Sequence, residues 1–327
     1  MASIDLDAGS AIADELLAAD AAHGTSLALV VMQAGQVVLE RYGHQPDTLF
    51  GPGGPVTADS TLISWSMAKS ITHAAVGILV GDGLLDPAAP APVPSWKGTD
   101  KDAVTLQHLL NMRSGMEWVE DYVDGAVSHV IEMLYGSGAG DMAAYAAARP
   151  LAHAPGEVWN YSSGTTNIIA RIVGDVVGNG RDGMEAFLRD RLFAPTGMHS
   201  AIPKFDDAGT FVGSSYVYAT ARDFGKFGEL YRNDGVAPDG TRVLPAGWRD
   251  HARTWTAHDE EANLSYGAQW WLWPQYPGSF ACHGYEGQHV IVLPDQELVI
   301  VHLGKTPAEH GPLLDALLLR LMATATA

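Results

Sequence analysis

The sequence predicts a mixed fold in which one β-sheet is built from strands at both chain ends and a helical middle is inserted into it. Two runs of β-branched residues lie near the N-terminus, and the C-terminal third holds four further strand-like stretches. The residues between these two regions carry mostly helical patterns. Strand signals at both ends of a long helical block indicate a single sheet to which both termini contribute.

The N-terminal region begins with an alanine-rich stretch of helical spacing, residues 11–22. Residues 27–32 and 37–42 are the two β-branched runs, and they are joined at Ala34-Gly35. Glycine at such a junction favours a tight turn, so this pair of runs is typical of a β-hairpin.

The middle and the C-terminal third follow in order. The predicted helices of the middle are residues 71–80, 105–115, 126–135, 141–148, 167–177, 183–192 and 220–232. The predicted C-terminal strands are residues 266–273, 279–283, 289–293 and 298–303, and an apolar-faced helix over 313–322 closes the chain. We therefore expect one domain over residues 1–327, with a sheet region at about 1–60 and 210–327 and a helical lobe at about 61–209.

Composition excludes several classes of partner. The chain has 327 residues and a formal net charge of −19, which disfavours binding to nucleic acid or to an anionic membrane. Its one cysteine permits no intramolecular disulfide, and the first residues lack the pattern of a signal peptide. No apolar run reaches the ~20 residues of a membrane-spanning helix. We expect a soluble cytoplasmic protein, and its oligomeric state stays open.

The most reactive pattern is Ser66-x-x-Lys69, which directly precedes the nearly uncharged helix predicted over 71–80. Residues three apart share one face of a helix. A lysine at the start of a buried helix tends to lose its proton, because burial disfavours the charged form. The amine can then act as a base towards the neighbouring hydroxyl, which makes Ser66 a candidate nucleophile. The alternative is an accidental pattern on a solvated helix.

Two later stretches bear on Ser66. Tyr161 stands in a loop before the helix predicted over 167–177, where its hydroxyl can relay a proton if a cation such as Lys69 lowers its pKa. A glycine-containing stretch, residues 280–288, lies between two strand signals and can supply a backbone N–H to an oxyanion hole, with the Ser66 N–H as the second donor. The alternatives are a surface turn at Tyr161 and a plain glycine-rich hairpin at 280–288.

Other patterns argue against different chemistries. No G-x-S-x-G, H-E-x-x-H, phosphate-binding loop or dinucleotide fingerprint occurs, so we expect no metal and no cofactor. His73 lies one turn beyond Lys69, and we expect it to be a hydrogen-bonded structural residue of the helix.

With these motifs in order, the chain resembles the serine hydrolases related to class C β-lactamases, DD-peptidases and family VIII esterases. Ser66-Met67-Ala68-Lys69 matches the S-x-x-K motif of that family, and Tyr161-Ser162-Ser163 matches its Y-x-N or Y-x-S. Cys282-His283-Gly284 falls where the family carries K-T-G or H-T-G. The stretches 159–164, 213–224 and 284–288 most resemble the branch that contains the 6-aminohexanoate-dimer hydrolases.

The resemblance implies an α+β fold of the β-lactamase type, with an antiparallel sheet flanked by helices. It also implies an acyl-enzyme mechanism in which Ser66 attacks, Lys69 takes its proton, and Tyr161 protonates the leaving group and later activates water. The N–H groups of Ser66 and Tyr285 would form the oxyanion hole. The implied substrate-binding residues are Ser163, Cys282, His283 and Gly284.

One departure from the family pattern bears on selectivity. Cys282 stands where β-lactamases and DD-peptidases carry a lysine or histidine that helps to orient a substrate carboxylate, and a thiol is no counter-ion. His283 follows it on a strand and should point to the opposite face. We therefore expect hydrolysis of small neutral esters or amides. The alternatives are a weak β-lactamase or D-amino-peptidase, and a catalytically silent binding protein with the same fold.

Overall fold

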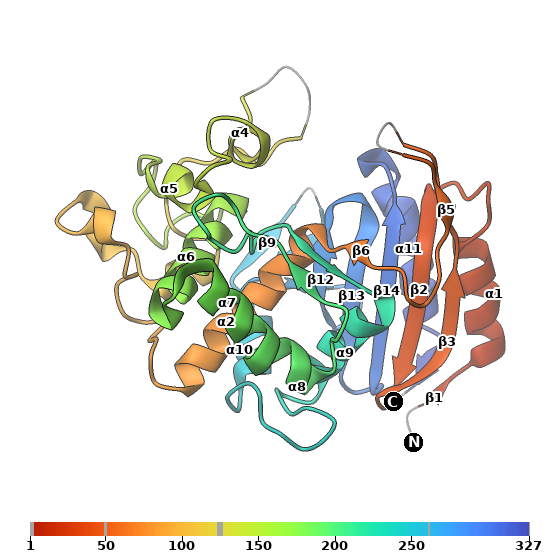
Figure 1. Ribbon diagram of the computed structural model, residues 1–327. Helices are drawn as coiled ribbons and strands as arrows, with labels where there is room; N and C mark the ends of the chain where they lie inside the picture. The colour runs from red at the N-terminus through yellow and green to blue at the C-terminus, as the bar shows by residue number, and fades with distance from the viewer. Residues whose placement is uncertain (1–2, 49–50, 123–126, 261, 327) are drawn as a thin grey trace.

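The computed structural model describes residues 3–48, 51–122, 127–260 and 262–326 (Figure 1). Its centre is an eight-stranded antiparallel sheet in the order β3-β2-β14-β13-β12-β11-β10-β9. The strands of this sheet are β2 (Thr25–Gln33), β3 (Gln36–Tyr42), β9 (Ala257–Asp259), β10 (Leu264–Tyr266), β11 (Trp271–Leu272), β12 (Phe280–Gly284), β13 (Gln288–Leu293) and β14 (Leu298–Lys305). The predicted α+β fold, with one sheet drawn from both ends of the chain, is confirmed.

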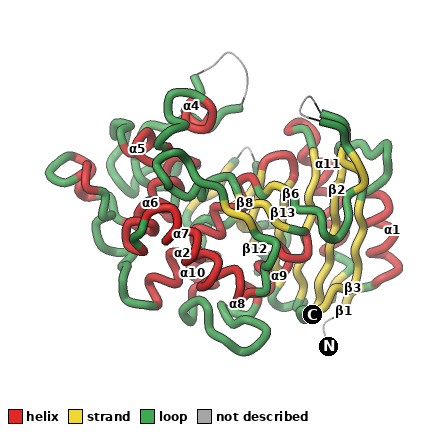
Figure 2. The backbone as a smooth tube through the Cα atoms, in the orientation of Figure 1, coloured by secondary structure: helices red, strands yellow, loops and turns green. Residues whose placement is uncertain are grey.

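The helices lie on both faces of this sheet (Figures 1 and 2). They are α1 (Leu6–Leu16), α2 (Ala68–Gly81), α3 (Leu106–Leu110), α4 (His129–Tyr135), α5 (Met142–Ala147), α6 (Ser163–Val177), α7 (Gly180–Phe187), α8 (Ala194–Thr196), α9 (Ala221–Arg232), α10 (Trp248–Arg253) and α11 (Gly311–Met322). Short 3-10 turns include η1 (Trp65–Met67) and η5 (Tyr285–Gly287). Small sheets pair β1 (Ser3–Ile4) with β15 (Ala325–Thr326), β4 (His44–Gln45) with β5 (Gly54–Pro55), and β8 (Val217–Ala219) with both β6 (Leu62–Ile63) and β7 (Ile202–Pro203).

Side-chain alternation along the strands creates two cores. On one face, residues such as Val290 and Val301 pack with α2, α9 and the helices of the middle segment. On the other face, residues such as Ile291 and Ile300 pack against α1 and α11. Neighbouring residues of a strand point to opposite faces, so the central strands are apolar along most of their length because helices cover both sides.

Several predicted boundaries differ from the structure for local reasons. The hairpin of β2 and β3 turns at Ala34 and Gly35 as expected, and both have positive φ. The helix predicted over 11–22 instead begins at Leu6, because the Asp5 side chain caps its first N–H groups. The strand predicted over 266–273 is two short strands, since Gln269 takes a left-handed conformation between them.

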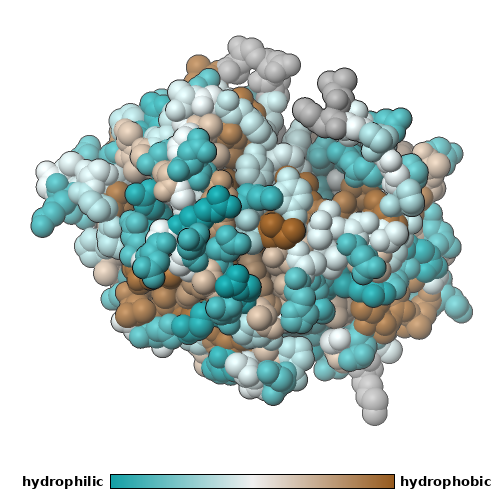
Figure 3. Space-filling view, in the orientation of Figure 1, coloured by the Kyte–Doolittle hydropathy of each residue, from teal (hydrophilic) through white to brown (hydrophobic). Residues whose placement is uncertain are grey.

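Two helices of the middle segment are also shorter than predicted. The helix expected over 105–115 ends at Leu110, and Met112 then takes a positive φ of 55°. The start of the helix expected over 126–135 falls partly outside the described residues, and α4 begins at His129. The face shown in Figure 3 is mostly hydrophilic with scattered apolar residues, as the net charge of −19 leads one to expect. No helix of the described residues is long and apolar enough to cross a membrane.

Candidate active site

Ser66 and Lys69 meet where the turn η1 passes into α2. Ser66 is the middle residue of η1, and Lys69 is the second residue of α2. The Lys69 Nζ lies 2.9 Å from the Ser66 Oγ, and the lysine side chain is among the largest fully buried ones. The spacing of three residues therefore brings the amine to the hydroxyl, as the sequence predicted.

Burial lowers the pKa of Lys69 to about 8, and the charge of Glu120 partly opposes this shift. Burial removes water from the ammonium, so the equilibrium shifts towards the neutral amine compared with an exposed lysine. With its pKa near 8, Lys69 can take a proton near neutral pH.

A loop from the middle of the chain gives Lys69 a second partner. The Ser214 carbonyl oxygen accepts a hydrogen bond from Lys69 Nζ at 3.1 Å. Gly213 lets this loop approach α2 closely, because a Cβ at this position would lie only 2.3 Å from the Thr72 Oγ1. The Thr72 hydroxyl in turn donates to the Gly213 carbonyl at 3.0 Å. The loop is thus fixed to the helix that carries Lys69.

The third partner of Lys69 is Ser163, the first residue of α6. Lys69 Nζ donates to Ser163 Oγ at 2.9 Å, and Ser163 Oγ donates to the carboxylate of Glu120. Ser163 is fully buried, and its hydroxyl contacts Lys69 and Glu120. A side chain at Gly164 would collide with Trp118, so glycine here allows the segment that bears Glu120 to approach α6.

Tyr161 lies beside the same pair. The Lys69 Nζ stands 4.8 Å from the centroid of the Tyr161 ring, on its face. Burial is the main cause that raises the pKa of Tyr161, the charge of Glu120 adds to it, and a hydrogen bond with Ser66 lowers it only partly. The expectation that Lys69 would lower the pKa of this tyrosine is therefore wrong. Tyr161 stays a neutral phenol, which suits a proton donor.

The second candidate oxyanion donor comes from the end of β12. Tyr285 begins η5, directly after Gly284, and its ring lies 6.0 Å from that of Trp65, the neighbour of Ser66. A Cβ at Gly284 would lie 2.3 Å from the Ser64 carbonyl oxygen, so only glycine allows this close approach of strand and nucleophile turn. Backbone N–H groups at the start of such turns have no helical partner.

Cys282 and His283 do not offer a charge to a substrate. Cys282 is 1% exposed and belongs to the core on the α2 face of the sheet, where burial raises the pKa of its thiol to about 12. His283 points to the opposite face, as predicted, and its Nε2 accepts a hydrogen bond from the Trp273 indole at 2.8 Å. Burial lowers the pKa of His283 to about 3, so it is neutral.

Comparison with known proteins identifies the family. The sequence model of the family described as Beta-lactamase matches residues 12–323, nearly the whole chain. The chain belongs to the β-lactamase family. It is therefore a serine hydrolase, as its motifs indicated.

Individual relatives agree with this assignment. A 6-aminohexanoate-dimer hydrolase of Paenarthrobacter ureafaciens is 29% identical over 301 residues, which cover 86% of this chain and 72% of the relative. A structure from Bacillus anthracis described as a 6-aminohexanoate-dimer hydrolase superposes with a TM-score of 0.75 at 23% identity, over 91% of this chain and 78% of that one. A family VIII carboxylesterase superposes with a TM-score of 0.70 at 16% identity, over 97% and 96% of the two chains.

Within this β-lactamase-family fold, two further observations complete the site. His73 is a structural residue: its ring nitrogens lie 2.6 Å from the Tyr231 hydroxyl and 3.0 Å from a nitrogen of His251. Glu120 was missed by the sequence analysis, because a carboxylate in a loop 51 residues after Lys69 carries no recognisable spacing.

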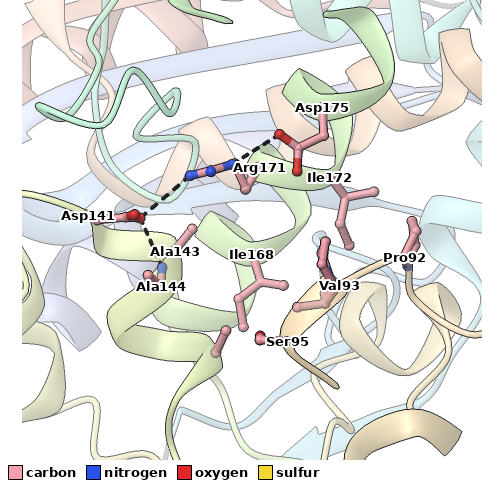
Figure 4. A pocket seen from close by; sticks show the side chains of 12 residues that line it. Pro92, Val93, Ser95, Asp141, Ala143, Ala144, Ile168, Arg171, Ile172 and Asp175 are labelled. Atoms are coloured by element: carbon pink, nitrogen blue, oxygen red, sulfur yellow. Dashed lines mark hydrogen bonds and ion pairs between the residues drawn. The ribbon is translucent and has the colours of Figure 1, made fainter. Parts of the chain in front are cut away.

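Elsewhere, the described residues contain no group of three or more His, Cys, Asp or Glu side chains that could hold a metal ion. A cavity of about 240 Å³ lies in the helical lobe, and none of the predicted site residues lines it (Figure 4). Its one cation, Arg171, is already paired with Asp141 and Asp175. We assign this cavity no part in the reaction.

Proposed function

We propose that this chain hydrolyses small neutral carboxylic esters or amides through an acyl-enzyme on Ser66. One observation carries the proposal: a buried amine with a pKa of about 8 lies 2.9 Å from the Ser66 hydroxyl. A serine hydroxyl is a weak nucleophile until a base takes its proton, and Lys69 is the base in hydrogen-bond reach.

The proposed steps use these side chains in turn. As Ser66 Oγ attacks the carbonyl carbon, its proton passes to Lys69, and the N–H groups of Ser66 and Tyr285 stabilise the oxyanion. When the tetrahedral intermediate collapses, the Tyr161 phenol gives its proton to the leaving oxygen or nitrogen, and the Lys69 ammonium restores that proton. Water then attacks the acyl-enzyme by the same route in reverse, with Tyr161 and Lys69 as its base.

The choice of substrate rests on two kinds of support. One relative is named as a 6-aminohexanoate-dimer hydrolase and one structural neighbour as a carboxylesterase, so amides and esters are both candidate substrates. The neutral Cys282 and His283 supply no cation for a carboxylate near the scissile bond. Amides and esters without such a carboxylate therefore suit the site better than penicillins or peptide C-termini.

A fluorophosphonate probe tests the proposal directly. We expect one covalent label on the peptide that contains Ser66, found by mass spectrometry of the intact protein and of its digest. Ser66→Ala and heat-unfolded wild-type protein are the controls and should stay unlabelled. Absence of a label on folded wild-type protein would instead support the silent binding protein, and a label on another serine would remove Ser66 from its role.

A further inference from the structure

The carboxylate of Glu120 is held in one orientation by four donors. Its Oε2 accepts from the Trp118 indole N–H at 2.6 Å and from the Ser163 backbone N–H at 2.8 Å. Its Oε1 accepts from the Ser163 hydroxyl and from the Tyr122 hydroxyl, the latter at 3.1 Å. Two donors at each oxygen occupy the lone pairs that a carboxylate offers. Glu120 therefore acts only as an acceptor in this arrangement.

This fixes the direction of the next hydrogen bond. A serine hydroxyl has a single proton, and that of Ser163 goes to Glu120. Ser163 Oγ can then only accept from Lys69 Nζ, 2.9 Å away. The Ser214 carbonyl, a second neighbour of this nitrogen, can also only accept.

The neutral amine of Lys69 has two protons and one lone pair. Both protons are required by Ser163 and Ser214, so the lone pair is left for the third neighbour, the Ser66 hydroxyl at 2.9 Å. We propose that Glu120 is a positioning residue that, through Ser163, aims the lone pair of Lys69 at the proton of Ser66. The inference rests on the proposed function and adds to it the residue that orients the base.

Without Glu120, the Ser163 hydroxyl no longer has a fixed acceptor for its proton. The Ser163 hydroxyl could then donate to Lys69, and the lone pair would turn away from Ser66. A second consequence concerns charge: burial lowers the pKa of Lys69, and the Glu120 charge raises it. Loss of that charge should move the pKa of Lys69 further down.

Few other groups can affect this titration. Among the described residues, the titratable side chains that face Lys69 are Glu120 and Tyr161. Burial raises the pKa of Tyr161, of Tyr122 bound to Glu120, and of Tyr266 packed on Tyr161, so all three stay neutral near pH 8.

The test compares Glu120→Gln, Ser163→Ala and the double variant, with the pH profile of kcat/KM for a neutral p-nitrophenyl ester as the readout. Glu117→Gln is the matched control, because this exposed glutamate precedes Glu120 by three residues in the same loop. Thermal unfolding followed by circular dichroism shows whether each variant is folded.

We expect the plateau of kcat/KM to fall about 10- to 100-fold in either single variant, which corresponds to one charge-assisted hydrogen bond. The acid limb of Glu120→Gln should lie at lower pH than in wild type. The double variant should be no slower than the worse single variant, because both changes break the same chain. Glu117→Gln should match wild type.

The inference fails if Glu120→Gln loses activity with its acid limb unmoved, since a loop anchor alone would act that way. It also fails if the two single effects multiply in the double variant. These outcomes are distinct from failure of the proposed function, in which wild-type protein neither takes the label nor hydrolyses the ester. If Glu120→Gln does not fold, Ser163→Ala decides the question, because Glu120 keeps its three other donors in that variant. A plateau of kcat/KM equal to that of wild type in Ser163→Ala would then overturn the inference.

Discussion

Two chains of hydrogen bonds in this protein pass through a buried serine, and they end differently. In the active site, Lys69 donates to Ser163, which donates to Glu120. In the second chain, which ends at the turn η5, His302 Nδ1 lies 2.7 Å from the Gly287 carbonyl and must donate to it, so its Nε2 accepts from the hydroxyl of Ser26 at 2.7 Å.

The two hydrogen-bond chains differ in whether they leave a lone pair that can take a proton. Ser26 has given its proton to His302, so it must accept from His23, and the chain closes on a backbone carbonyl. In the active site, the lone pair of Lys69 is left facing Ser66. Burial lowers the pKa of His302 to about 4 and that of Lys69 to about 8, so a lowered pKa occurs in both places. Reactivity therefore depends on the free lone pair and its target, and burial alone does not produce it.

Removal of the Lys69 amine should have the largest effect. Lys69→Met keeps most of the stem and should lower kcat/KM ~10²–10⁴-fold, the usual contribution of a general base. Stability should not fall with it: the folded pKa of about 8 lies below the ordinary 10.5, so the ammonium opposes folding at pH 7.

Lys101→Met is the matched control for that measurement. Burial also lowers the pKa of Lys101, but its Nζ contacts the Ala147 carbonyl at 2.7 Å and no candidate nucleophile. Ester hydrolysis and thermal unfolding should be recorded for both variants. Equal losses of activity in the two would mean that a buried amine acts through the fold and not as a base.

The role of Tyr161 predicts a dependence on the leaving group. Tyr161→Phe should slow hydrolysis of an anilide about 100-fold or more, since an amine cannot leave without a proton. In kcat/KM, which reports the steps up to departure of the leaving group, the matched p-nitrophenyl ester should be slowed much less, because p-nitrophenolate needs no proton to leave. Tyr266→Phe, a buried tyrosine that packs on Tyr161 at 5.9 Å, is the control. Equal slowing of both substrates by Tyr161→Phe would remove it as the acid.

The sequence could predict the parts of this site that depend on local spacing. Ser66 and Lys69 lie three residues apart, so a single helical turn brings them together, and the sheet follows from apolar strands at both chain ends. The pKa of Tyr161 was harder to predict. Its place in the site was expected from the sequence, but the direction of its pKa shift depends on burial among Trp159, Tyr266 and Trp271.

Contacts between segments that lie far apart in the sequence cannot be predicted from the spacing of neighbouring residues. Glu120 reaches Ser163, and through it Lys69, because Gly164 lets Trp118 pack against α6. Cys282 shows the opposite error: motif position suggested that it contacts substrate, but the side chain turns into the core. A replacement of Cys282 by lysine would bury an ammonium there, so it would damage the fold before it could bind a carboxylate.

Selectivity is therefore better tested by changing the substrate. A p-nitrophenyl ester of butyrate should be hydrolysed about 10–150-fold faster than the hemisuccinate ester. The hemisuccinate carboxylate would lose hydration on binding and would not gain the charge-assisted hydrogen bond, worth roughly 1.5–3 kcal/mol, that could offset this loss. A chromogenic cephalosporin, which also bears a carboxylate, should be slow for the same reason. The comparison uses kcat/KM on wild-type protein. A preference for the hemisuccinate or the cephalosporin would show that another group binds the carboxylate.

The histidine chain should contribute to the stability of the fold, and the pH dependence of unfolding measures this contribution. A histidine whose folded pKa is about 4, against 6.5 in the unfolded chain, binds its proton more weakly when folded. Its contribution is fully present above pH 6.5 and is lost as pH falls towards 4, by on the order of 2 kcal/mol at pH 5. His302→Gln should therefore lower stability at pH 8 but flatten the fall of the unfolding free energy between pH 6.5 and 4. Urea unfolding over this range measures the slope, with the exposed His153→Gln as control. An unchanged slope in His302→Gln would mean that His302 does not take up a proton on unfolding.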